Sequence, residues 1–365
     1  MKKNFTLLAF LLCSLMGLAQ IPAGYYNTAT GTGYALKTQL FNIIKNQTDL
    51  GYSGLWVTYQ TSDRDVFTGT GYENDNTIYD MYTENPTGSA GECGFIYGTD
   101  QDTGSGGGSE CDVYNREHIV PQSIFSQAAP MRHDAHFVTP TDKKVNGDRG
   151  DNPHGNVAVV SSTTNNGGKH GSSAIAGYTG QVFEPNSAFK GDIARMYFYF
   201  ATRYQDQLAS WSYVMFNGTS DQVFTTPFLN MLITWHNNDP VSVFEITRNN
   251  AIYARQNNRN PFIDHPEYVC QIYSAQCAAL SSESFALENA ISIYPNPAIN
   301  NEVTISSETE LKSIVLYNIN GQIIQEIKNP TRVDNSYKIN NLSSGFYLVQ
   351  MASENAVATK KVIVN

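Results

Sequence analysis

The spacing of apolar residues changes near residue 285, and this change limits the fold more than any other feature of the chain. Before it, segments such as residues 34–47 and 191–204 repeat their apolar side chains at the interval of an α-helix. After it, apolar and polar residues alternate in short runs, and Asn-Gly and Ser-Gly turns separate these runs as they separate β-strands. A length of 365 residues also exceeds that of one ordinary domain. We therefore predict two domains, residues 21–285 and residues 286–365.

The predicted fold class is α+β. The first domain is expected to be mostly helical, with a small strand element around residues 114–123 and a loop-rich stretch that continues through residues 165–173. The second domain is expected to be a small all-β sandwich. Hydrophobic residues make up 41% of the chain, which is enough for a sizeable core, and charged residues at 15% are too few for a disordered chain. The expected helices of the first domain lie at residues 34–47, 191–204, 227–236 and 242–256.

The first twenty residues have the pattern of a secretory signal peptide. Lys2 and Lys3 precede an apolar run, and Gly17-Leu18-Ala19 forms a small-x-small cleavage site, so residues 1–19 are expected to be removed. A membrane anchor is the alternative, but the run is shorter than the ~20 residues that span a bilayer. No later segment is long and apolar enough to span, so we predict a protein exported through the periplasm to the cell surface or the medium.

Export makes the remaining cysteines candidates for disulfides, because that compartment is oxidising. Cys93, Cys111, Cys270 and Cys277 can pair in three ways. Proximity along the chain favours Cys93 with Cys111 and Cys270 with Cys277, since short loops close most easily. A zinc site is the alternative, but the spacing of zinc ligands is missing from this sequence.

The stretch YNREHIVPQS, residues 114–123, sets Glu117 directly before His118. An imidazole can take a proton from water near neutral pH, and a carboxylate can hold a hard cation. Neighbours on a regular strand point to opposite faces, so both can serve one site only where the strand ends or bends. Pro121 fits such an end, because proline cannot continue a strand ladder. A solvated Glu-His pair on a strand is the alternative for this dipeptide alone.

A second stretch, HDAHFVTPTDKKVNGDRGDNPHG at residues 133–155, strengthens the chemical interpretation. A short helix is predicted from Pro140 and Thr141, with Gly147 and Gly150 ending it and Asn146 on it. The amide oxygen of Asn146 adds a ligand without adding charge, so a bound ion keeps its Lewis acidity. A histidine on a strand beside a polar ligand on a helix is the arrangement that a one-metal phosphodiesterase requires.

Further residues near these stretches receive smaller roles. Arg149 is expected to grip a phosphate oxygen during catalysis, with a salt bridge to Asp134 or Asp148 as the alternative. Asp134 and His136 are expected to orient the base and the helix from behind. Arg116 is a candidate substrate ligand, with a solvated strand residue as the alternative.

These motifs together resemble the endonuclease I family of secreted bacterial nucleases, which have the ββα-metal (His-Me) finger. The resemblance implies that His118 is the general base and that Glu117 and Asn146 hold Mg²⁺, or Mn²⁺ or Ca²⁺ in its place. The metal would polarise the phosphate and stabilise the leaving 3′ oxygen. The likeness spans residues 34–269 and is carried by REHIVPQS, DAHFVTP, VNGDRG, FEP, KGDIARMYFYFATRY and NRNPFIDHPEYV.

Four motifs, YPNPA, LYNINGQ, LSSGFYLVQM and KKVIVN, are spread over roughly the last 75 residues. Together they resemble the sorting domain of proteins exported by the type IX secretion system, which would make that machinery a partner. An ordinary β-sandwich binding module is the alternative.

The expected function is therefore that of an extracellular, Mg²⁺-dependent endonuclease that cleaves DNA, and RNA as well, with little sequence preference. The net charge of −10 predicts modest affinity for nucleic acid, with divalent cations bridging to phosphate. Two rivals remain at this point: a surface-displayed binding or adhesin module, and a metal-dependent hydrolase of small phosphoesters. A deep apolar pocket would favour the second rival, whereas an open cleft with arginines would favour a polymer.

Overall fold

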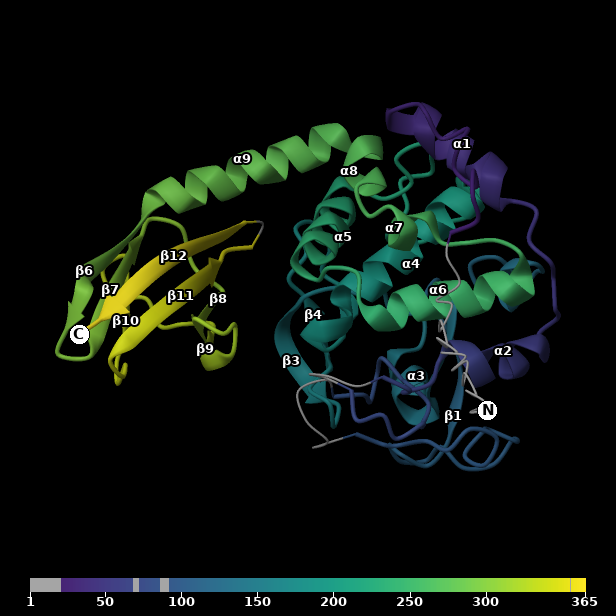
Figure 1. Ribbon diagram of the computed structural model, residues 1–365, viewed down its shortest axis with the longest axis horizontal. Coiled ribbons are helices and arrows are strands. Elements are labelled where there is room, and N and C mark those ends of the chain that lie inside the picture. The colour runs from purple at the N-terminus through teal and green to yellow at the C-terminus, as the bar shows by residue number, and fades with distance from the viewer. Residues whose placement is uncertain (1–20, 68–71, 86–91, 355) are drawn as a thin grey trace, which may run out of the picture.

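The buried apolar side chains form two main clusters in the computed structural model, which describes residues 21–67, 72–85, 92–354 and 356–365. One cluster runs from Leu36 to Leu280 and the other from Leu287 to Val364. Figure 1 shows the two corresponding parts, a larger one of mixed helices and strands and a smaller one of strands, joined by the long helix α9. The polar stretch expected to separate the domains near residue 285 belongs to α9, Ser274–Ala290. The predicted signal peptide, residues 1–19, lies outside the described residues.

Helix α4 lies at the centre of the larger part. All of its residues except Lys190 are buried, because apolar side chains occupy every face of the sequence DIARMYFYFATR. Helices α1, α5 and α7 pack against it, and α2 packs against α6. The helices are α1 Gly33–Ile44, α2 Gly54–Ser62, α3 Lys143–Arg149, α4 Lys190–Arg203, α5 Thr226–Asn238, α6 Val243–Gln256, α7 Pro261–Asp264, α8 Tyr268–Ile272 and α9. The four helices predicted from apolar spacing are thus present as α1, α4, α5 and α6.

Two small sheets accompany these helices. Strands β1, Tyr114–His118, and β2, Val138–Asp142, pair in antiparallel fashion, and α3 follows directly and contacts both. The second sheet contains β3 Val157–Thr163, β4 Lys169–Ser173 and β5 Gln181–Glu184, in that order.

The second sheet corrects the sequence analysis, which expected a loop-rich stretch through residues 165–173. The side chains of β3 are almost all exposed, so the strand lacks the alternation that would have identified it. Across the chain 31% of residues are helical and 24% lie in strands, so a mostly helical first domain is not confirmed.

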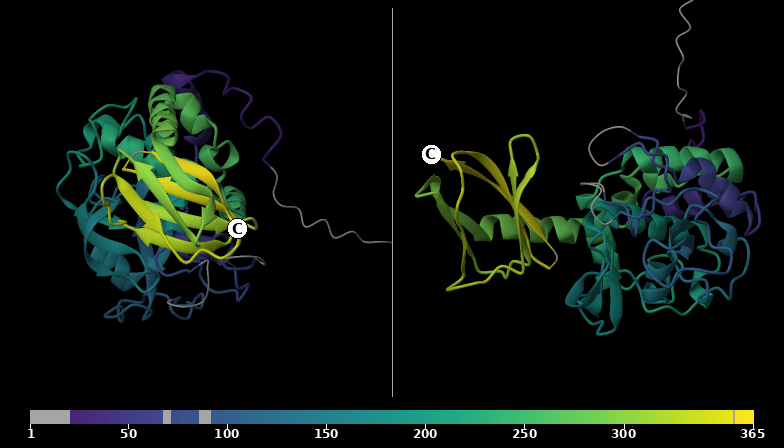
Figure 2. Two further views of the ribbon diagram at one scale, coloured as in Figure 1. Left: turned by 90° about the vertical axis from the view of Figure 1, so that its left-hand side faces the viewer. Right: turned by 90° about the horizontal axis from the view of Figure 1, so that it is seen from below.

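The smaller part is a single curled sheet of seven strands in the order β10-β7-β6-β12-β11-β8-β9. Its two halves meet where β6 and β12 pair in parallel at Ala298 and Val364, so the expected sandwich of two sheets is replaced by one sheet that curls around its core. Figure 2 shows this curled sheet at the far end of α9. The strands are β6 Ile291–Ile299, β7 Glu302–Ser307, β8 Ser313–Asn318, β9 Ile323–Lys328, β10 Ser336–Ile339, β11 Gly345–Ala352 and β12 Val357–Val364.

Two disulfides are present, Cys93–Cys111 and Cys270–Cys277. They join the partners that proximity along the chain favours, so this prediction is confirmed. No helix in the described part of the chain is long and apolar enough to cross a membrane.

Candidate active site

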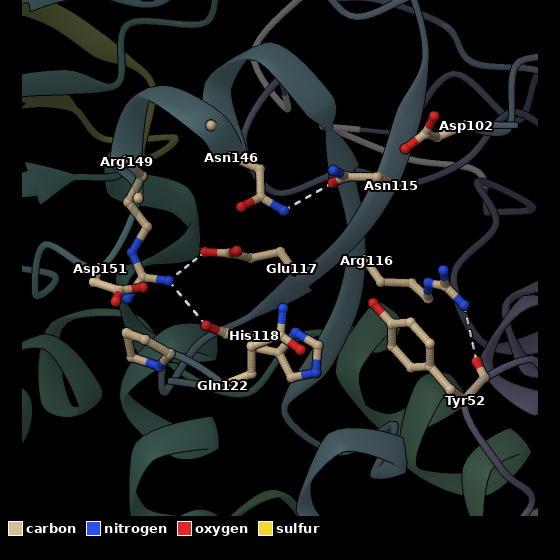
Figure 3. Close-up of a pocket in the computed structure, with 13 residues that line it drawn as sticks. Tyr52, Asp102, Asn115, Arg116, Glu117, His118, Gln122, Asn146, Arg149 and Asp151 are labelled. Carbon is tan, nitrogen blue, oxygen red and sulfur yellow. Dashed lines mark hydrogen bonds and ion pairs between the residues drawn. The ribbon is translucent and has the colours of Figure 1, made fainter. Parts of the chain in front are cut away.

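Glu117 and His118 both line one cavity of about 290 Å³, and Asn146 lines it as well. Adjacent strand residues reach the same space because β1 ends at His118, as the sequence analysis required. Both side chains are nearly buried, with exposures of 3% for Glu117 and 4% for His118. Figure 3 shows the Glu117 carboxylate and the Asn146 amide facing the same space.

The Glu117 carboxylate is held by two donors from different parts of the chain. The hydroxyl of Tyr82 donates to its Oε1 at 2.7 Å, and Nη1 of Arg149 forms an ion pair with the same oxygen. Burial raises the pKa of Glu117, and the attraction of Arg149 is the main effect that opposes this rise. The carboxylate is thus fixed in position by neighbours that were not evident from the motif.

The imidazole of His118 is fixed in one tautomer. Its Nε2 lies 3.2 Å from the carbonyl oxygen of Arg132. Because a carbonyl can only accept, Nε2 carries the hydrogen and Nδ1 keeps its lone pair. Burial lowers the pKa of His118 to about 3, so the ring is neutral at neutral pH. The side chain therefore has the protonation state of a general base.

Helix α3 positions Asn146. The Asp142 side chain caps the helix by accepting from the backbone N–H groups of Lys144 at 2.7 Å and Val145 at 2.9 Å. The helix starts at Lys143 rather than at Pro140, because Pro140 and Thr141 pair with β1 as part of β2. Nδ2 of Asn146 donates to Oδ1 of Asn115 at 2.8 Å, and no described residue donates a hydrogen bond to its Oδ1.

One buried carboxylate supports both halves of this site. Asp80, 1% exposed, accepts from the backbone N–H of Asp142 at 2.8 Å and from that of Tyr82 at 2.8 Å. Tyr82 holds Glu117, and Asp142 caps the helix that carries Asn146. Asp80 therefore links β1, which ends at His118, to helix α3.

The lobe closed by the Cys93–Cys111 disulfide contacts the same helix start. The backbone N–H of Cys111 donates to Oδ2 of Asp142 at 2.7 Å, and Nζ of Lys143 pairs with Asp102 at 2.9 Å. Sequence analysis assigned this lobe no role. Its position shows that it supports the first turn of α3.

The placement of Arg149 differs from both sequence-based expectations. Its side chain is fully buried and pairs with Glu117 rather than with Asp134 or Asp148. It also donates to the carbonyl oxygens of His118 and Ile119 at 2.9 Å each and of Asn152 at 3.0 Å. Its donors are engaged by the protein, so its position is that of a support for Glu117 rather than of a phosphate ligand.

Asp134 and His136 lie behind β2 and do not line the cavity. Asp134 accepts from the hydroxyls of Tyr199 at 2.8 Å and Tyr204 at 2.7 Å, which ties the segment before β2 to the C-terminal end of α4. Nε2 of His136 lies 3.0 Å from the carbonyl oxygen of Asn258. Burial lowers the pKa of His136 to about 4. Neither side chain hydrogen-bonds to His118, so both support the packing behind the site rather than the base itself.

Arg116 lines the cavity and rests on aromatic rings. Its Cζ lies 3.5 Å from the ring centroid of Tyr52 and 4.3 Å from that of Trp56, and its Nη1 donates to the Tyr52 carbonyl at 3.0 Å (Figure 3). Cζ of Arg132 lies 4.1 Å from the same Tyr52 centroid. Sequence analysis missed Tyr52 and Arg132, since neither belongs to a motif with a recognisable spacing.

Comparison with known proteins assigns both parts of the chain. Residues 32–267 match the family model of endonuclease I, and residues 292–365 match that of the secretion system C-terminal sorting domain. An extracellular ribonuclease of Bacillus amyloliquefaciens is 34% identical over 257 residues, which cover 68% of this chain and 78% of that protein. An extracellular ribonuclease of Bacillus subtilis is 32% identical over 257 residues, which again cover 68% of this chain and 78% of that protein. Among solved structures, PorZ of the Porphyromonas gingivalis type IX secretion system matches 23% of this chain and 12% of its own, at 17% identity and a TM-score of 0.18.

Proposed function

The chain belongs to the endonuclease I family, and from that premise we propose that it hydrolyses the phosphodiester bonds of both DNA and RNA with the help of Mg²⁺. It is a secreted or cell-surface nuclease, as its sorting domain and its extracellular relatives indicate. The observation that carries the proposal is the meeting of Glu117, His118 and Asn146 at one cavity. The ribonuclease names of the two Bacillus relatives support including RNA among the substrates.

The residues at the cavity fit a hard divalent cation. Glu117 offers a carboxylate oxygen, and Asn146 offers an amide oxygen that no described residue occupies. Oxygen ligands of this kind suit Mg²⁺, and Mn²⁺ or Ca²⁺ as well. When bound there, the ion would supply Lewis acidity at the phosphate and stabilise the leaving 3′ oxygen.

His118 would act as the general base. Its Nδ1 carries the lone pair, so it can accept a proton from a water molecule that attacks phosphorus. The hydrogen bond from Nε2 to the Arg132 carbonyl keeps the ring in place as the proton arrives. The negative phosphate that enters the cavity favours the imidazolium that forms. In-line attack with departure of the 3′ oxygen would leave a 5′-phosphate on the product.

Recognition would depend on the nucleic-acid backbone. Arg116 is the arginine of the cavity whose guanidinium lacks a carboxylate partner among the described residues, so it is suited to a phosphate oxygen. Contacts to phosphate carry no sequence information directly. We therefore expect cleavage with little sequence preference.

The test is plasmid nicking and RNA degradation by the full mature chain, with Mg²⁺ or with EDTA. His118→Ala and Asn146→Ala should each lower the rate by about two orders of magnitude or more, and EDTA should stop the wild type. His265→Ala serves as the control, because His265 is half-buried, does not line the cavity and pairs with the nearby Glu267. Folded wild type that leaves both nucleic acids intact with Mg²⁺, Mn²⁺ and Ca²⁺ would reject the proposal in favour of a binding module.

The sorting domain implies export by a type IX secretion system. We further propose that residues 286–365 serve this export and that residues 21–285 form the catalytic domain. The separate hydrophobic clusters on either side of α9 support this division.

A further inference from the structure

We propose that Arg116 and Arg132, both held on the ring of Tyr52, form a second phosphate site that binds the phosphate next to the scissile one. This inference rests on the proposed nuclease function and deepens it. A second phosphate site would make a strand with several phosphates a better substrate for the cavity than an isolated phosphodiester.

The first observation is that these two arginines lack anionic partners. The four arginines with exposures of 2% or less each form an ion pair with a carboxylate, and these are Arg149, Arg195, Arg248 and Arg259. Neither Arg116 nor Arg132 has a carboxylate within ion-pair distance in the described part of the chain. The most deeply buried arginines are thus each paired with a carboxylate, whereas Arg116 and Arg132 beside the cavity are not.

Their hydrogen-bonding groups are also incompletely used. Nε of Arg116 and Nε of Arg132 are both buried and have no hydrogen-bond partner within the described residues. A buried donor without a partner costs free energy, so its persistence calls for an explanation. A phosphate oxygen is a suitable acceptor, because the planar guanidinium can donate two parallel hydrogen bonds to it.

The pair is also electrostatically unfavourable without a ligand. Both guanidinium groups lie over the Tyr52 ring, at 3.5 Å and 4.1 Å from its centroid. The ring faces attract each cation, which holds the two side chains in fixed positions. The repulsion between the cations remains, and an anion that contacts both would remove it.

The location joins this pair to the catalytic residues. Arg116 directly precedes Glu117 on β1 and lines the same cavity. Arg132 supplies the carbonyl oxygen that accepts from His118, and the Tyr52 ring stacks beside the His118 ring, with centroids 6.1 Å apart and planes inclined by 29°. When the scissile phosphate of a strand lies at His118, a neighbouring phosphate of the same strand would therefore lie at Arg116 and Arg132.

The test compares two substrates on the full mature chain with Mg²⁺. Bis(p-nitrophenyl) phosphate has a single phosphate, whereas a 12-nucleotide single strand has many. Arg132→Gln should lower kcat/KM for the strand about ten-fold, mainly through KM, and leave that for the single diester unchanged. We also expect weaker salt dependence of strand binding by Arg132→Gln in EDTA. The slope of the logarithm of the binding constant against the logarithm of salt concentration should become about one unit less steep than in the wild type. Lys338→Gln is the matched control, because it removes one exposed charge from the sorting domain.

Each result decides the matter. Equal losses on both substrates would overturn the proposal, because Arg132 would then act on the scissile phosphate or on His118. No loss on either substrate would overturn it as well. Failure of the wild type to cleave either substrate would instead reject the nuclease function itself. Tyr52→Leu adds a second measurement, since it removes the ring under both arginines and should lower kcat/KM for the strand by more than it lowers that for the single diester.

Discussion

The backbone nitrogen of Asp142 lies 2.8 Å from Oδ2 of Asp80, and this hydrogen bond joins the cap of helix α3 to the segment that positions Glu117. Asp80 also accepts from the backbone N–H of Tyr82 and from the hydroxyl of Thr83 at 2.7 Å. The two proposed metal ligands thus depend on one buried side chain that touches neither of them.

Replacement of Asp80 by alanine should destabilise the fold and loosen the metal site together. It leaves three buried donors without an acceptor, so we expect the free energy of unfolding to fall by roughly 3 kcal/mol. Urea unfolding measures this loss, and Mg²⁺ titration of activity should show a higher requirement. Asp148→Ala on α3 is the control, because its partner Lys144 is exposed and the pair is worth little. An unchanged Mg²⁺ requirement in Asp80→Ala would disprove the link.

Glu117→Gln and Asn146→Ala should both abolish Mg²⁺-dependent cleavage but differ in stability. The first leaves the fully buried guanidinium of Arg149 without a charge partner, which we expect to cost about 3 kcal/mol or more. The second removes one hydrogen bond, to Asn115, at a partly exposed position. Thermal unfolding of the two variants separates the effects. Equal stability would show that Arg149 finds other acceptors.

The stability of the protein should fall on acidification, and His136 should contribute to that fall. Burial lowers its pKa to about 4, below the ordinary value of 6.5 that it regains on unfolding. Between these values the unfolded chain binds more protons, so stability rises with pH and is lost as pH drops from 6.5 to 4. The full contribution is about 3 kcal/mol. His136→Gln should therefore show a shallower loss of unfolding free energy over this range, and a parallel loss would contradict the assignment.

Removal of the Cys93–Cys111 disulfide should weaken metal use, whereas removal of Cys270–Cys277 should not. The first bond closes 18 residues and the second 7, so loop entropy predicts losses of about 3 and about 2 kcal/mol. Beyond stability, only the first bond holds the Cys111 backbone against Asp142. Double alanine variants measured at a temperature where both remain folded should differ in the Mg²⁺ needed for half-maximal activity.

The sequence identifies those site residues that share a short motif. Glu117 and His118 are adjacent, and Asn146 lies on a helix with clear end signals. Tyr82, Tyr52 and Asp80 come from distant segments whose approach depends on tertiary packing, so no local pattern reveals them.

The partner of Arg149 illustrates the same limit. Asp148 is its neighbour in sequence but faces solvent, where it pairs with Lys144 one helical turn away. The next residue along the helix points inward, to a carboxylate 32 positions earlier in the chain. Which face of a short helix is buried decides the pairing, and seven residues are too few to show a face.

Helix α9 has a consequence for the cell that makes this enzyme. Its 17 residues extend over about 25 Å, with Leu280 packed in the hydrophobic cluster of the nuclease part and Leu287 in that of the tail. The catalytic cavity and the tail therefore lie in separate parts of the molecule. Secretion machinery that binds the tail would not need to contact the catalytic cavity. We expect that the same tail, fused through a similar helix, would export an unrelated folded enzyme.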